Sequence, residues 1–170
     1  MVDITSKSAS ALGRWKSGEE KVYADAADII ANLARDKNNN IIETIKVITH
    51  SMGGAFGNGF IAGLQRYISM SPIEIQRQIK ITLAANFDPY QAEDFHANPD
   101  VKTQQFKHKN GWNIIGMGWL ANGTEDGAEQ VSVNKNDSSD HSIFSFFSNI
   151  SKLVEGNYTW DNVNQKWIKQ

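Results

Sequence analysis

The segment that most constrains the fold of this chain runs from residue 41 to residue 70. Residues 41–50 (IIETIKVITH) are β-branched and become apolar toward their end, which predicts a buried strand. Ser51, Met52 and two glycines follow, and from residue 54 to about 70 apolar side chains recur at helical spacing. The sequence therefore predicts a strand that enters a helix through a tight turn containing a serine.

The rest of the chain alternates between the same two patterns. Further strands are predicted at 80–87 and 101–109, and further helices at 20–35, 71–78 and 141–154. Strands that alternate with helices imply an α/β fold, with a mostly parallel sheet and helices on both of its faces. The last residues, 156–170, predict a small β-hairpin with NYTW and KWIK as its strands.

Three segments lack either pattern. Residues 1–19 are expected to be a loop or a disordered start, 90–100 a polar loop, and 110–140, with five glycines, a long irregular connection. No internal repeat or linker divides the chain, so we expect a single domain over residues 1–170.

Composition excludes several classes of function. The net charge is −2 and no basic run is present, so neither a nucleic-acid surface nor an anionic-membrane surface is expected. The chain has no cysteine, which excludes a disulfide framework, a thiolate metal site and a cysteine nucleophile. No apolar stretch approaches the roughly 18 residues of a membrane span, and residues 1–20 lack the apolar core of a signal peptide. We expect a soluble protein whose location stays open.

Ser51 is placed for nucleophilic chemistry. A serine hydroxyl needs a base and must protrude from the backbone, and a tight strand–serine–helix turn makes it protrude. Such a turn crowds the positions two before and two after the serine, which favours the pattern G-x-S-x-G. The string here is Thr49-His50-Ser51-Met52-Gly53, with threonine at the leading position. The backbone N–H of Met52 is expected to serve an oxyanion pocket. The alternative is a glycine turn that carries a surface serine.

The string THSMGG resembles the HSMGG or HSLGG nucleophile elbow of the α/β-hydrolases, especially lipases and esterases. Its position after an apolar strand and before a helix is the context that this motif requires. The resemblance implies a serine hydrolase that cleaves carboxylic esters, of small molecules or of lipids, without a cofactor. It also implies an acid and then a histidine later in the chain.

Residues 41–170 are also similar to lipase-like modules at the C-termini of some large bacterial Rhs-type proteins. The similarity lies in the string HSMGG…NFDPYQ…FKHKN…NGxxDG…DHSIFSF. It implies that the chain is one domain of a longer polypeptide or acts beside a partner domain, or is a small descendant of such a domain. The competing hypothesis is a truncated or non-catalytic hydrolase-like module used for binding.

Asp88 is the expected acid. It follows the predicted strand at 80–87, and NFDPYQ resembles the strand-end Asp-Pro of pancreatic-type lipases, in which that aspartate is the triad acid. Alternatively, Asp88 initiates a turn ahead of a proline. Other lipases place the acid one strand later, where this chain has Asn110, which could support the histidine by a hydrogen bond without lending charge. Asp126 and Asp137 stay open as alternatives.

His141 is the expected base. It follows the long connection and opens a predicted helix, and the triad histidine of α/β-hydrolases typically lies on a late loop ahead of the last helix. The alternative is a water-exposed histidine at a helix start. His50 is expected to shape the elbow, and His108 to line the site. No metal site is expected, because these histidines and His96 lack a ligand-spacing motif such as HExxH.

The first part of the chain is short for this family. An α/β-hydrolase normally has several strands ahead of the elbow, and the loop after an early strand gives the second oxyanion N–H. Only about 40 residues precede the predicted elbow strand here. Either the chain is a fragment, or the fold is minimal and another donor, from the loop expected at residues 13–18, takes that place. Four aromatic residues are expected to line an apolar acyl pocket, with core packing as the alternative for each: Phe56, Phe87, Trp112 and Trp119.

Overall fold

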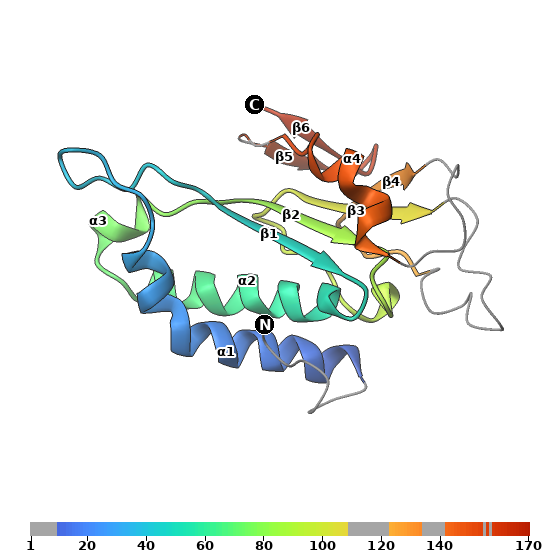
Figure 1. Cartoon of the computed structure of the whole chain (residues 1–170), viewed down its shortest axis with the longest axis horizontal. Coiled ribbons are helices and arrows are strands. Elements are labelled where there is room, and N and C mark those ends of the chain that lie inside the picture. Colours follow the sequence, from blue (N-terminus) through green and yellow to red (C-terminus); the bar gives the residue numbers. More distant parts are fainter. Residues whose placement is uncertain (1–9, 109–122, 134–141, 155, 157) are drawn as a thin grey trace.

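The computed structural model describes residues 10–108, 123–133, 142–154, 156 and 158–170. Four strands form one parallel sheet in the order β1-β2-β3-β4. Their bounds are β1 Ile45–His50, β2 Ile81–Phe87, β3 Thr103–His108 and β4 Glu129–Val133. The architecture is α/β, and all four strands end at the same edge of the sheet (Figure 1).

Two long helices lie on one side of this sheet. Helix α2 (Gly53–Ser69) packs against β1 and β2, and helix α1 (Ala11–Ala31) packs against α2 (Figure 1). Apolar side chains of both helices meet the sheet's first two strands in the main core, which includes Val22, Ala26, Leu64 and Ile79. Helix α3 (Ile73–Gln76) is a single turn between α2 and β2. No helix in these described ranges combines the length and the apolar character needed to cross a bilayer.

The opposite side of the sheet carries shorter elements. The turn η3 (Ile143–Phe146) runs into α4 (Phe147–Ile150), and Phe146 packs on Phe87 and Phe106. The antiparallel hairpin β5 (Tyr158–Asp161) and β6 (Lys166–Lys169) lies beside them, as expected from the sequence (Figure 1). The indole Nε1 of Trp167 donates to the carbonyl of Thr103, 3.0 Å away, which joins the hairpin to β3.

The expectation of a loop through residue 19 was wrong for residues 11–19. Helix α1 begins at Ala11, with the Ser10 hydroxyl capping it by accepting from the Gly13 N–H. The contact between α1 and α2 explains why so polar a segment is helical. A Cβ at Gly59 of α2 would lie 1.8 Å from the carbonyl oxygen of Trp15, so glycine lets the two backbones touch. Packing against α2 outweighs the weak apolar pattern of the first turns.

The structure also differs from the expectations for three later segments. The connection 110–140 contains strand β4, which pairs in parallel with β3 between Glu129 and Val133. One face of this strand, EQVSV, is only partly buried. A short edge strand of this kind shows little alternation of apolar and polar residues. The helix predicted over 141–154 is limited, in its described part, to η3 and the single turn of α4. Segment 90–100, predicted as a loop, contains the short turn η1 (Ala92–Asp94).

Candidate functional site

Ser51 lies in the turn between β1 and α2, at the carboxyl edge of the sheet. Its φ is +54°, in the left-handed region, which costs a residue with a Cβ about 1–2 kcal/mol. Backbone hydrogen bonds on both sides of the residue hold it there. The Ser51 N–H donates to the carbonyl of Phe87 at 3.0 Å, and the Ser51 carbonyl accepts from Gly54 N–H at 3.2 Å. Strain of this kind at a strand–serine–helix turn is the conformation that the nucleophile elbow requires.

The structure explains how Thr49 replaces the expected glycine. A Cβ at Gly57 of α2 would lie only 2.3 Å from the Thr49 methyl group Cγ2. Gly57 therefore leaves the space that the threonine occupies. The Thr49 hydroxyl donates to Asn86 Oδ1 at 2.5 Å. The crowding expected two residues before the serine is relieved from the helix side rather than by a small residue in the strand.

Asp88 follows β2 directly and is 5 % exposed. One carboxylate oxygen, Oδ2, lies 2.7 Å from His108 Nδ1, and the other, Oδ1, accepts from the His108 backbone N–H at 3.3 Å. Because a carboxylate only accepts, this contact places the proton of the imidazole on Nδ1. The His108 ring packs against Phe146 with a centroid separation of 4.4 Å. The structure thus gives Asp88 a histidine partner, but it is His108.

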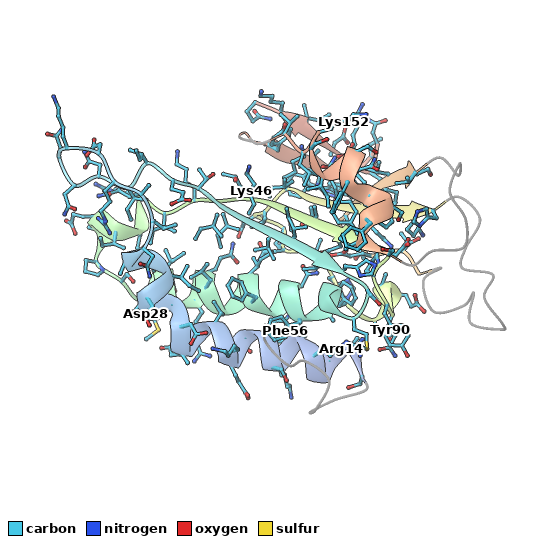
Figure 2. The ribbon with its side chains drawn as sticks, viewed as in Figure 1. Arg14, Asp28, Lys46, Phe56, Tyr90 and Lys152 are labelled. Atoms are coloured by element: carbon cyan, nitrogen blue, oxygen red, sulfur yellow. The ribbon has the colours of Figure 1, made fainter. Side chains whose placement is uncertain are left out.

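A second strained turn joins this site to the first helix. Tyr90 N–H donates to the Ser51 carbonyl at 3.0 Å, and Gln91 has a φ of +57°. Arg14 Nη2 donates to Gln91 Oε1 at 2.7 Å, and its guanidinium lies 5.0 Å from the centre of the Tyr90 ring. Figure 2 shows Arg14 at the start of α1 close to Tyr90. Helix α1 therefore braces the turn that holds Ser51.

The expected oxyanion donors have different outcomes. Met52 occupies the position before the first residue of α2, where the backbone N–H groups form the positive end of the helix dipole. Its role as a donor stays a prediction. Residues 13–18 do not form the loop proposed as the second donor, because they are helical in α1. Backbone N–H groups within a helix are engaged by carbonyls one turn earlier.

The remaining predicted residues have different outcomes. Phe87 is fully buried and stacks on Phe106 at 4.5 Å, so it belongs to the core rather than to an acyl pocket. His96 pairs with Asp126 at 3.1 Å on the surface, with both side chains more than 70 % exposed. His50 ends β1 opposite Phe87 of β2, beside the turn. The following lie outside the described residues: Asn110, Trp112, Trp119, Asp137 and His141. Phe56 lies on α2 where it meets α1 (Figure 2).

One residue of the site's surroundings was missed from the sequence. Glu125 is 1 % exposed and accepts hydrogen bonds from Asn58 of α2 and Asn86 of β2. Burial raises its pKa from 4.5 to about 7, against the opposing effect of the two amide donors. Its segment, NGTEDG, has the composition of a solvated loop, so nothing in the pattern predicts burial.

Two of the cavities that described residues line lie away from Ser51. The larger, of about 770 Å³, lies where β2 and β3 begin and is lined by Lys80, Ile81 and Lys102 among others. Ligands of parallel sheets bind at the opposite, carboxyl edge. The smaller, of about 400 Å³, lies between α1, α2 and residues 94–99, with Trp15 and Phe95 in its wall. The candidate site lies at the carboxyl edge of the sheet, where Ser51, Asp88 and His108 follow or end β1, β2 and β3.

Within the described ranges, no group of three or more His, Asp or Glu side chains is arranged to hold a metal ion. Comparison of the chain with protein-family models, with curated proteins and with solved structures finds no match. The geometry of this site and the chemistry of its side chains are therefore the basis for a proposed function.

Proposed function

We propose that this chain is a serine hydrolase that cleaves carboxylic esters, with Ser51 as its nucleophile and with the α/β-hydrolase arrangement of its site. The observation that carries the proposal is the left-handed Ser51 at the β1–α2 turn beside the buried carboxylate of Asp88 on the adjacent strand. The order of these groups along the chain is that of the elbow-type hydrolases.

In the proposed reaction, the Ser51 hydroxyl attacks the ester carbonyl carbon while a histidine takes its proton. The same histidine returns the proton to the leaving alcohol, and water then attacks the acyl-enzyme by the reverse path. Asp88 orients this histidine and stabilises its charged form. The Met52 N–H, at the start of α2, stabilises the negative oxygen of the tetrahedral intermediate.

We keep His141 as the proposed base because of its place in the sequence, on a late segment ahead of the last predicted helix, whereas the order of the strands bears on His108. A triad histidine bridges nucleophile and acid, whereas the strand order β1-β2-β3 puts Asp88 between Ser51 and His108. Adjacent strands lie about 4.8 Å apart, so β1 and β3 are separated by about 10 Å. A carboxylate has about four acceptor positions, which allows Asp88 to hold His108 and to orient a second histidine. In this assignment His108 fixes the carboxylate and His141 moves the proton.

Hydrolysis of p-nitrophenyl esters of increasing acyl length tests the proposal. The wild-type chain should release p-nitrophenol catalytically, and the acyl length that it prefers would define the substrate class. Ser51→Ala should abolish turnover, and Asp88→Asn should lower kcat by roughly 10³-fold or more. Ser69→Ala, at the exposed end of α2, is the matched control. Equal turnover by the wild type and Ser51→Ala would refute Ser51 as the nucleophile, and a folded wild type with no turnover above background would favour a non-catalytic module.

A further inference from the structure

Among the described residues, Glu125 is the buried acid that the proposed reaction does not use. It precedes β4, and its backbone N–H donates to the side-chain oxygen of Gln105 at 2.8 Å. Its carboxylate accepts from Asn86 Nδ2 at 2.7 Å through Oε2 and from Asn58 Nδ2 at 2.9 Å through Oε1. The carboxylate therefore connects α2 on one side with the sheet on the other.

Both of these asparagines continue to the turn that contains Ser51. Asn86 Oδ1 accepts the hydrogen bond of the Thr49 hydroxyl, two residues before the serine. Asn58 Nδ2 also lies 3.3 Å from the carbonyl of Gly54, three residues after the serine. The network thus holds the strand side and the helix side of one turn through a single carboxylate.

We propose that Glu125 is a positioning residue for Ser51, which sets the separation of the two sides of the nucleophile turn through Asn86 and Asn58. The inference depends on the hydrolase function proposed above. A buried carboxylate is costly unless its hydrogen bonds are complete, and an apolar side chain would fill the same space at less cost. A carboxylate that bonds both asparagines beside the strained turn is explained by the orientation that it imposes on that turn.

The charged groups of the neighbouring elements have other partners. Lys107 of β3 donates to the carbonyl of Gly123 and to the Thr124 hydroxyl, and His108 contacts Asp88. Asp126, next in sequence, pairs with His96. From α2, β2 and β3, the side chains that bond Glu125 are the amides of Asn58, Asn86 and Gln105. The network therefore responds mainly to the protonation of Glu125 itself.

Protonation should change the helix side of the network. Two amide N–H donors match an ionised carboxylate, whereas a carboxylic acid must also donate. Asn58 Oδ1 is buried and has no hydrogen-bond partner among the described residues. If the Asn58 amide turns over, this oxygen can accept the proton of Glu125, and the bond from Nδ2 to Gly54 is lost. Ser51 should therefore be held most firmly when Glu125 is ionised.

Labelling kinetics with a fluorophosphonate probe test this inference. Glu125→Gln should lower the labelling rate of Ser51 about tenfold or more, and it should make the rise in that rate near pH 7 shallower, leaving only the rise that the histidine base produces. Glu129→Gln is the matched control, because Glu129 also accepts from an amide, Gln104 Nε2 at 2.9 Å, but lies on the edge strand β4. Unchanged rate and pH profile in a folded Glu125→Gln variant would overturn the proposal.

Two further measurements cover the other outcomes. If Glu125→Gln does not fold, Thr49→Val breaks the strand side of the network with a side chain of similar size, and should slow labelling to the same extent. If the wild type is not labelled at all, the hydrolase function fails. The side-chain amide NMR resonances of Asn58 and Asn86 then decide whether the network exists. They should titrate together near pH 7 in the wild type, and their independence of pH would overturn the inference.

Discussion

His108 Nδ1 lies 2.7 Å from the carboxylate of Asp88, on the side of Asp88 away from Ser51 in the order of the strands. A histidine in this position can fix the acid without being the group that takes the proton from the serine. The two histidines assigned to these different roles, His108 and His141, should therefore respond differently to substitution.

His141→Ala should lower kcat for ester hydrolysis by roughly 10³-fold or more, because it removes the proposed base. His108→Phe keeps the ring that packs on Phe146 but removes the N–H that holds Asp88. It should lower kcat by about tenfold or less. Steady-state kinetics on one p-nitrophenyl ester measure both. The reverse order, with His108→Phe the more damaging variant, would assign the base to His108.

Thr49 and Gly57 should be coupled in stability. A Cβ at residue 57 would lie 2.3 Å from Thr49 Cγ2, so Gly57→Ala should destabilise the fold by about 1–3 kcal/mol through overpacking. Thr49→Ser removes that methyl group and keeps the hydroxyl that bonds Asn86. The double variant should recover most of the loss in urea denaturation. Additive losses in the double-mutant cycle would show that the two residues do not share this space.

The contact between α1 and α2 predicts a sharp difference between two glycines. Gly59→Ala places a methyl group 1.8 Å from the Trp15 carbonyl oxygen, a backbone atom that cannot move alone. It should lower the free energy of unfolding by about 3 kcal/mol or more. At Gly53, the nearest atom to a Cβ is Thr49 Cβ at 3.6 Å, and Gly53→Ala should leave stability nearly unchanged. Equal melting temperatures for the Gly59→Ala and Gly53→Ala variants would show that α1 does not touch α2 at Gly59.

Glu125 should make stability fall as pH rises. Its pKa is about 7 in the folded state and near 4.5 in the unfolded chain, so between these values the folded state binds the extra proton. The stabilising contribution is complete below about pH 4.5 and is lost as pH approaches 7, by about 3 kcal/mol. Urea unfolding of the wild type and of Glu125→Gln across this range isolates the effect. A constant difference between the two proteins would contradict it.

The fold could be predicted wherever one face or both faces of an element are strongly apolar. Strands β1 and β2, helix α2 and the terminal hairpin all lie within a few residues of their predicted bounds. Strand β4 was missed because EQVSV is a partly buried edge strand. The first turns of α1 were missed because their helical state depends on backbone contact with α2, which local sequence does not record.

The candidate site could likewise be predicted from the sequence only in part. The sequence alone predicted the serine turn, and its left-handed backbone is what such a turn needs. The sequence indicated Asp88 by its place after a strand, but not its contact with His108, because pairing across strands depends on register. Glu125 was missed because a glutamate between polar residues is ordinarily exposed. Only the tertiary structure brings Asn58 and Asn86 to it.

The most direct test of the central claim is mass spectrometry of the intact protein after treatment with a fluorophosphonate. We predict one adduct on the wild-type chain, located by peptide mapping to Ser51, and none on a folded Ser51→Ala variant. Loss of reactivity in Asp88→Asn would connect the adduct to the proposed triad. A folded wild type that gains no adduct, or an adduct that persists in Ser51→Ala, would contradict the assignment of Ser51 as the nucleophile.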